Sequence, residues 1–306
     1  MDVAVLGAGA TGRGIAQVCA AAGHAVALHG EDANVVMDGI DAVQAGLDDA
    51  VASGQVTAAE RDEAVDSIEG TTGLEAAVGD ADLVVDATDG DREERMELFA
   101  AVEDVVDAET VVATSATTVS VTAVTAGLRQ PGRGVGLHFV DPPAAPLVEV
   151  VVADQTTERT RNRAESFVAG LDREAVVVRD APGFATTRLT LALSVEAMQM
   201  LDERVAGVEA IDRAVEVGRD HPVGPLAAAD AAGLDARLDE LEYLASSLGE
   251  RFAPPPVLRE KVERGDLGRK SGEGFYVWEG GEPVEPSDPD PTPDLRADSP
   301  TDPGGP

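Results

Sequence analysis

The stretch GLHFVDPPAAPLVEVV, residues 136–151, contains two side chains that can carry out acid–base chemistry. His138 follows an apolar run, and the carboxylate of Glu149 lies eleven positions later inside a second apolar run. An imidazole titrates near neutral pH, and a carboxylate on its far nitrogen fixes the tautomer and stabilises the charged form. Spacing alone favours a histidine without a role beside a strand-end glutamate. The other motifs of the chain have to decide between these interpretations.

A glycine-rich loop near the start of the chain predicts a dinucleotide site. In VAVLGAGATGRGIAQ, the pattern G-x-G-x-x-G stands between a strand and a helix. Gly7 permits the tight turn, Gly9 lets backbone N–H groups approach a pyrophosphate, and Gly12 lets the helix pack on the strand. The helix then faces the phosphates with its positive end. The alternative is a glycine-rich turn in some other doubly wound protein.

The end of the second strand predicts which dinucleotide binds. An acid that receives the ribose hydroxyls is expected there, roughly 20 residues after the glycine loop. The sequence HAVALHGED has Gly30 at the usual position, and either Glu31 or Asp32 can reach a ribose. A 2′-phosphate would require an arginine, and none follows before Arg61. We therefore expect NAD rather than NADP.

The first part of the chain predicts an α/β domain. From residue 2 to about 180, short apolar runs alternate with alanine-rich helical stretches, with a long helical insertion at 33–68. Near-continuous apolar strands separated by helices indicate a mainly parallel, Rossmann-type doubly wound sheet covered on both faces. We expect an NAD-binding domain at 1–181. The strand candidates are DVAVLG, HAVALH, ADLVVDAT, TVVATS, GVGLHF, LVEVVV and AVVVR.

After RDAPGF the strand signals stop, and helical periodicity with Pro and Gly at the joints predicts a smaller, all-helical C-terminal domain at 182–279. From residue 280 to 306 the composition turns to Pro, Asp, Gly and Ser, which predicts a disordered acidic tail. The expected helices span 184–205, 209–219, 226–249 and 256–264.

Acidic residues dominate the composition. The chain has 58 acidic and 23 basic residues, a formal net charge of -35, and its only lysines are Lys261 and Lys270. Little basic surface is left to neutralise phosphates, so neither nucleic acid nor an anionic membrane is expected as a partner. Molar salt shortens the Debye length to roughly 3 Å and relieves the self-repulsion. The composition resembles that of haloarchaeal proteins, with ordinary acidity as the alternative.

Cysteine content and apolar runs bear on disulfides, metals and membranes. Cys19 is the single cysteine and lies among alanines, which indicates a small buried residue without a disulfide. We assign no metal ligand. The chain enters a strand at once, which leaves no room for a signal peptide, and no apolar run approaches the roughly 20 residues of a membrane span. We expect a soluble, cytoplasmic protein.

The order of these motifs resembles the 3-hydroxyacyl-CoA dehydrogenase family from residue 1 to about 278. This resemblance implies an NAD enzyme that interconverts (S)-3-hydroxyacyl-CoA and 3-ketoacyl-CoA, with His138 as the acid/base and Glu149 as its partner. A base has to take the hydroxyl proton as the hydride leaves, because an oxocarbenium would be costly. The resemblance thus reverses the preference that spacing gave. Besides the glycine loop, it includes ATSATTVSVT, LHFVDP…PLVEVV, DAPGFATTRL, HPVGPLAAADAAGLD and GRKSGEGFY.

Several positions depart from the family pattern. Thr117 stands where the family has a serine that touches the substrate oxygen, and it keeps the hydroxyl; a strand-end threonine of no consequence is the alternative. Asp141 and Thr187 replace two asparagines, and Gly90 replaces an acid. An ionised Asp141 would favour positively charged NAD⁺ and repel an anionic substrate. The alternative is a neutral exchange in an acid-biased protein.

Two cations match family positions near the cofactor. Arg95 takes the place of a lysine, and Lys270 matches a lysine of the GRKSG segment that reaches the dinucleotide. A solvated surface cation is the alternative for both. The support for CoA is weaker, because the insertion that cradles CoA in the family has Arg61 as its only basic residue.

The leading hypothesis is a short-chain enzyme acting on substrates such as 3-hydroxybutyryl-CoA. One alternative is an NAD dehydrogenase of a small hydroxy acid without CoA, because the PP…PLVE spacing is similar to relatives that oxidise sugar acids or carnitine. Another is a degenerate paralogue that only binds the dinucleotide. The resemblance also implies that the helical domain at 182–279 binds substrate. Alanine-rich faces on 184–205 and 226–249, together with the resemblance, predict a homodimer through this domain, with internal packing as the alternative. Chain length and pathway stay open.

Overall fold

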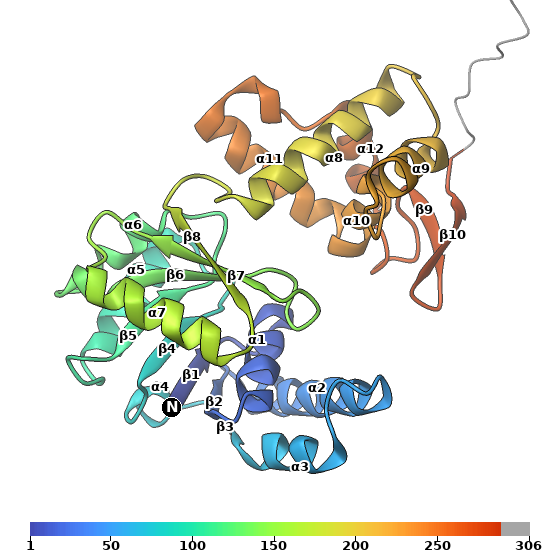
Figure 1. The fold of residues 1–306 in the computed structure, drawn as a ribbon. Coiled ribbons are helices and arrows are strands. Elements are labelled where there is room, and N and C mark those ends of the chain that lie inside the picture. The colour runs from blue at the N-terminus through green and yellow to red at the C-terminus, as the bar shows by residue number, and fades with distance from the viewer. Residues whose placement is uncertain (289–306) are drawn as a thin grey trace, which may run out of the picture. The chain divides into compact units, whose positions relative to one another are not determined.

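The computed structural model describes residues 1–288, and the chain divides into two units, one spanning Met1–Ala185 and the other beginning at Thr186 (Figure 1). The predicted boundary after residue 181 falls in the segment that joins the last strand of the first unit to the first helix of the second. Within residues 1–288, no helix combines the length and the hydropathy that a membrane crossing requires.

The first unit is built on an eight-stranded sheet with the strand order β3-β2-β1-β4-β5-β6-β7-β8. Only β6 and β7 pair antiparallel; the other neighbours are parallel. The predicted Rossmann-type sheet is therefore confirmed. Its strands are β1 (Asp2–Leu6), β2 (Ala25–His29), β3 (Ile68–Thr71), β4 (Leu83–Asp86), β5 (Val111–Thr114), β6 (Gly134–Phe139), β7 (Leu147–Val152) and β8 (Glu174–Arg179).

Helices cover both faces of this sheet because the strands are apolar on both sides. In β1, Val3 and Val5 belong to one buried cluster, and Ala4 and Leu6 to the other. The first cluster includes side chains of α1 (Ala10–Ala21), α2 (Ala33–Ala52), α3 (Ala58–Asp66) and α7 (Glu158–Gly170). The second includes side chains of α4 (Leu74–Val78), α5 (Arg92–Glu103) and α6 (Val121–Thr125).

The helical insertion consists of α2 and α3, and capping explains where these helices begin. Asp32 caps α2, and Thr57 and Glu60 form a reciprocal capping box at the start of α3. The last residue of the predicted insertion, Ile68, instead opens β3, an edge strand that the sequence did not predict. Its sequence IEGT has one large apolar residue and therefore carries no strand signal.

The second unit contains five α-helices among its described residues. These are α8 (Thr186–Asp202), α9 (Val208–Arg219), α10 (Pro225–Ala232), α11 (Leu234–Leu248) and α12 (Pro256–Arg264). The single helix expected at 226–249 is wrong, because Gly233 has φ +99° and breaks it into α10 and α11. Short 3₁₀ turns lie at Pro131–Arg133 in the first unit and at Glu250–Phe252 in the second.

The second unit is not all-helical, because a hairpin of β9 (Tyr276–Glu279) and β10 (Glu282–Pro286) follows the helices. The expected disordered tail from residue 280 is therefore wrong for its first residues. Gly280 and Gly281 both have positive φ and form the tight turn. The buried amine of Lys261 then holds the following residues by donating to Ser287 and Asp288. The rest of the expected tail, 289–306, lies outside the described residues.

The GRKSGEGFY motif has a structural role, because this segment packs around the carboxylate of Asp230 near the end of α10. Gly274 packs so closely on Asp230 that a Cβ at this position would lie 2.2 Å from the carboxylate. Burial raises the pKa of Asp230, while its hydrogen bonds act in the opposite direction. The carboxylate accepts hydrogen bonds from the backbone N–H groups of Phe275 and Tyr276 and from the indole N–H of Trp278.

Candidate active site

Most of the functional side chains of the first unit lie at or just after the carboxyl ends of four parallel strands. Because β1, β4, β5 and β6 run in one direction, the loops after them emerge at the same edge of the sheet. The chain order reverses between β1 and β4, since β2 and β3 lie on one side and β4 to β8 on the other. Open α/β sheets bind their ligands at this switch point.

The glycine loop after β1 has the geometry that a pyrophosphate requires. Gly7 has φ +107°, and a Cβ there would lie 2.5 Å from the carbonyl oxygen of Ala87 in the loop after β4. A Cβ on Gly12 would lie 1.8 Å from the Gly7 oxygen, so only glycine lets α1 approach the loop. Apart from its two chain neighbours, no atom of residues 1–288 lies within 4 Å of a Cβ built on Gly9. This open space at the N-terminus of α1 fits the phosphates of NAD.

Two alanine substitutions should separate ligand contact from folding in this loop. Gly9→Ala is expected to leave the free energy of unfolding within about 0.5 kcal/mol of wild type, because its methyl group meets no protein atom. It should nevertheless raise the Kd for NADH by about tenfold or more, equivalent to ~1.4 kcal/mol. Gly12→Ala should lower the free energy of unfolding and also raise the Kd for NADH, because its methyl group would clash with the Gly7 carbonyl. Urea unfolding in molar KCl and calorimetry measure the two quantities; wild-type affinity in Gly9→Ala would contradict the assignment.

After β2, the structure distinguishes the two acids, Glu31 and Asp32, that the sequence offered as contacts for the ribose. Asp32 caps α2, with its Oδ1 accepting from the Asn34 N–H at 2.6 Å. Glu31 is exposed and stays the candidate for the ribose hydroxyls. Burial lowers the pKa of neighbouring His29, so this imidazole adds no positive charge at neutral pH. The surroundings therefore suit a ribose hydroxyl better than a 2′-phosphate.

The antiparallel pairing of β6 with β7 brings His138 and Glu149 together. They are direct cross-strand partners, and His138 Nδ1 lies 2.7 Å from Glu149 Oε2. The glutamate is fully buried, and the histidine side chain is 13% exposed. With Nδ1 on the carboxylate, Nε2 on the opposite side of the ring is the nitrogen suited to exchange a proton with a substrate. The pair has the contact that the acid/base interpretation requires.

The second oxygen of Glu149 also has a fixed partner. Its Oε1 accepts from the backbone N–H of Ala185 at 2.8 Å, just before the second unit begins. The ring of Phe184 lies beside the histidine, with 5.8 Å between the ring centroids. Neither contact could be read from the sequence. The motif DAPGF signals a turn there, but not which side chain the turn approaches.

The remaining positions of the predicted site fall in both units. In the first unit, half-buried Thr117 follows β5, and exposed Asp141, with φ +42°, follows β6. Thr187 and Lys270 belong to the second unit. Thr187 lies buried in the first turn of α8, and the half-exposed Lys270 amine is 2.5 Å from Asp235. The roles of these four residues stay predictions.

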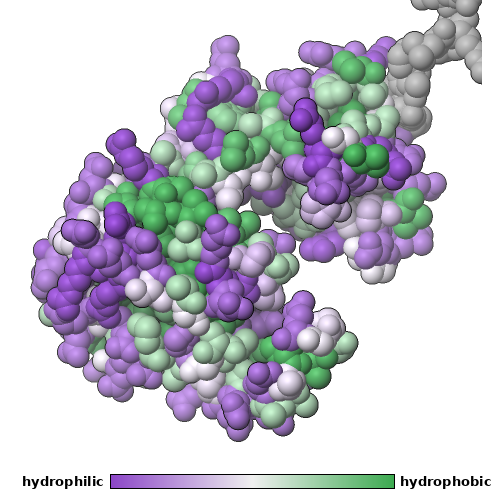
Figure 2. Space-filling view, viewed as in Figure 1, coloured by the Kyte–Doolittle hydropathy of each residue, from purple (hydrophilic) through white to green (hydrophobic). Residues whose placement is uncertain are grey.

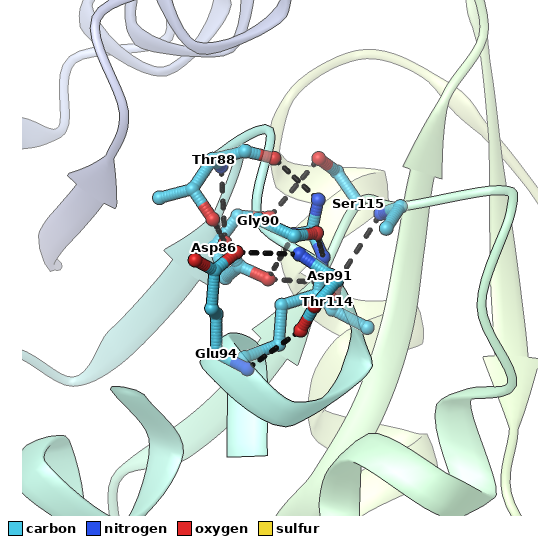
Figure 3. Close-up of polar contacts among 9 residues, drawn as sticks. Asp86, Thr88, Gly90, Asp91, Glu94, Thr114 and Ser115 are labelled. Atoms are coloured by element: carbon cyan, nitrogen blue, oxygen red, sulfur yellow. Dashed lines mark hydrogen bonds and ion pairs between the residues drawn. The ribbon is translucent and has the colours of Figure 1, made fainter. Parts of the chain in front are cut away.

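Arg95 is not a solvated surface cation, because it is buried and its donors are held within the loop after β4. Nη1 lies 2.5 Å from Asp86 Oδ2, Nε donates to the Gly90 carbonyl at 2.8 Å, and Nη2 donates to the Thr88 carbonyl. Figure 3 shows Asp86, Thr88 and Gly90 gathered in this cluster at the start of α5. The guanidinium thus shapes the loop that packs against Gly7.

Asp86, the last residue of β4, is the centre of this cluster and was missed in the sequence analysis. It is fully buried, and its carboxylate also accepts from the Thr114 hydroxyl at 2.9 Å and from the Thr88 N–H at 3.0 Å. The only sequence signal for Asp86 was its place as an acid at the end of the apolar run LVVD.

Within residues 1–288, no group of three or more His, Cys, Asp or Glu side chains is arranged to hold a metal ion.

Comparison with known proteins assigns the chain to a family. The NAD-binding domain of 3-hydroxyacyl-CoA dehydrogenases matches residues 2–181, and the C-terminal domain of the same family matches residues 183–278. A 3-hydroxybutyryl-CoA dehydrogenase of Mycobacterium tuberculosis is 37% identical over 284 residues, which cover 90% of this chain and 98% of that protein.

Solved structures give the same result. The crystal structure of Mycobacterium tuberculosis FadB2 has a TM-score of 0.87 at 36% identity and covers 90% of this chain and 98% of its own. The (S)-3-hydroxybutyryl-CoA dehydrogenase PaaH1 of Ralstonia eutropha has a TM-score of 0.84 at 31% identity, with coverage of 91% and 99%. The chain therefore belongs to the 3-hydroxyacyl-CoA dehydrogenase family, and its first unit is the NAD-binding domain of that family.

Proposed function

We propose that this protein is an NAD-dependent dehydrogenase that interconverts short-chain (S)-3-hydroxyacyl-CoA and 3-ketoacyl-CoA, such as 3-hydroxybutyryl-CoA and acetoacetyl-CoA. The observation that carries the proposal is the 2.7 Å contact between His138 and the buried carboxylate of Glu149 at the edge of the sheet where the glycine loop emerges. Relatives named 3-hydroxybutyryl-CoA dehydrogenase support the substrate class.

The residues of the site divide the work of the reaction. NAD, when bound, accepts or supplies the hydride. His138 takes the hydroxyl proton through Nε2 during oxidation and returns it during reduction, which avoids a charged oxygen intermediate. Glu149 holds the ring in one tautomer and stabilises the imidazolium. The Thr117 hydroxyl binds the substrate oxygen, Glu31 binds the ribose, and Arg95 orders the loop beside the glycine turn.

The decisive experiment is the reduction of acetoacetyl-CoA by NADH, followed at 340 nm in molar KCl. We expect saturable turnover and a large preference for the thioester over free acetoacetate. Oxidation of a panel of sugar acids and carnitine with NAD⁺ tests the non-CoA alternative, and parallel acetoacetyl-CoA assays with NADPH test the choice of cofactor. NADH binding without turnover of any of these substrates would contradict the proposal and favour a dinucleotide-binding paralogue.

The charge distribution supports a cytoplasmic protein that works in concentrated salt, as haloarchaeal proteins do. The net charge is -35, and the visible face of the molecule is mostly hydrophilic (Figure 2). A CoA thioester carries several negative charges, so its binding to such a protein is favourable only when salt screens the repulsion. Activity that rises between low and molar KCl would agree with this assignment, and activity that falls would oppose it.

A homodimer through the second unit accounts for the apolar residues exposed on α8. Leu189 is 72% exposed, and Leu193, one turn later, is 36% exposed. Leu189→Glu should therefore halve the mass measured by light scattering in molar KCl, because a dimer interface does not tolerate an unpaired charge. Val217→Glu is the control, since Val217 is 70% exposed on α9 and is left outside the proposed interface. A monomeric wild type, or a dimeric Leu189→Glu, would contradict the proposal.

A further inference from the structure

The segment between β8 and α8 is tied to the catalytic pair by its backbone. Asp180, directly after β8, accepts from the Ser120 hydroxyl at 2.7 Å and from the Thr122 N–H at 2.8 Å, which fixes the start of the segment. At its other end, the Ala185 N–H donates to Glu149 Oε1 at 2.8 Å. Between these two anchors, the backbone has to make a sharp turn.

Phe184 makes this turn in a conformation that few large residues adopt. Gly183 has φ +73°, which is ordinary for glycine, but Phe184 follows with φ +46°. A bulky side chain in the left-handed region costs free energy and persists only where surrounding contacts hold it. A glycine at position 184 would adopt the same backbone without this cost. Contacts of the Phe184 ring must therefore offset the cost of this backbone conformation.

The contacts of the ring supply that explanation. Phe184 is 6% exposed and packs in a small cluster with Val121, Val151 and Ala153. The ring also lies beside His138, with 5.8 Å between the ring centroids and an angle of 50° between the ring planes. Because this ring is anchored on the sheet, the backbone after it is held where the Ala185 N–H meets Glu149.

We propose that Phe184 is a positioning residue for the catalytic pair: its buried ring holds the left-handed turn that aims the Ala185 N–H at Glu149. The N–H fixes the carboxylate in the rotamer that faces His138 and supports its charged form. Phe184 thus acts on the histidine through the glutamate. This inference rests on the proposed role of the His138–Glu149 pair and adds a residue to it.

A double-mutant cycle tests whether the effect passes through Glu149. Phe184→Ala should lower kcat by about 10–100-fold with wild-type Glu149, as loss of a supporting contact does at other sites. In the Glu149→Gln background, the same substitution should change kcat by less than about threefold, because its target is already impaired. Equal losses in both backgrounds would overturn the proposal. Phe184→Leu keeps more buried surface and replaces Phe184→Ala if that variant does not fold.

A second readout does not depend on activity. The tautomer of His138, followed by ¹⁵N NMR of the imidazole without substrate, should become mixed in Phe184→Ala and in Glu149→Gln, because a carboxylate that faces Nδ1 fixes the tautomer. Phe167→Ala is the matched control, since Phe167 is 4% exposed and packs in a different cluster. An unchanged tautomer in Phe184→Ala would overturn the inference. Lack of acetoacetyl-CoA turnover by wild type would instead reject the proposed function and leave this measurement valid.

Discussion

Replacement of His138 by glutamine is expected to lower kcat for acetoacetyl-CoA reduction by about 10²–10⁴-fold, the usual contribution of a positioned acid or base. Glutamine preserves much of the shape and a polar contact with Glu149, but its amide cannot give or take a proton near neutral pH. The hydride would then have to move without coupled protonation of the oxygen. The loss should therefore appear in kcat, which stopped-flow measurement of NADH oxidation in molar KCl determines.

Binding and folding provide the controls for this experiment. His138 lies on β6, whereas the glycine loop follows β1, so the Kd for NADH should change by less than about threefold when no direct contact is lost. The unfolding midpoint should stay near that of wild type, because His138 is partly exposed and its replacement is uncharged. Equal rates in the two proteins would remove His138 from the reaction and end the dehydrogenase proposal in its present form.

The strands of the first unit could be predicted where burial on both faces makes the sequence continuously apolar. LVVD and VVAT are of this kind, and all their residues are buried in β4 and β5. The edge strand β3 lacks this signal because none of its residues is fully buried. The strand β10 has the composition of a disordered tail. A glycine turn before it and the amine of Lys261, which is distant in sequence and binds Ser287 just after it, hold this segment in place. Such tertiary contacts leave no local pattern.

The contact between His138 and Glu149 could not be predicted from spacing, because it depends on strand direction. Eleven positions bring two residues face to face only if the intervening turn returns antiparallel, and the remaining strands of this sheet pair in parallel. The resemblance to a family supplied the missing information. The burial of Arg95 was harder to predict than this contact. A cation near the start of a helix, among acidic residues, has the sequence pattern of a solvated surface.

Arg95→Met is expected to lower the free energy of unfolding by about 3–5 kcal/mol, the usual cost of leaving a buried charge without its partner. Asp86 is fully buried and the Arg95 side chain is 6% exposed, so water cannot replace the lost guanidinium. Arg95→Lys should recover only part of this loss, because an ammonium cannot present a planar fork to Asp86, Thr88 and Gly90 at once. Urea unfolding in molar KCl gives these free energies.

Arg92 on the same helix offers the matched control. Its ion pair with Glu93 is solvent-exposed, with side chains 57% and 63% accessible, and such pairs contribute little to stability. Arg92→Met should therefore have little effect in molar KCl, whereas the loss in Arg95→Met should persist because salt screens buried charges poorly. Since the loop that Arg95 holds packs on Gly7, Arg95→Met should also weaken NADH binding. If Arg95→Met were no more destabilising than Arg92→Met, the guanidinium would not be the element that holds this loop in place.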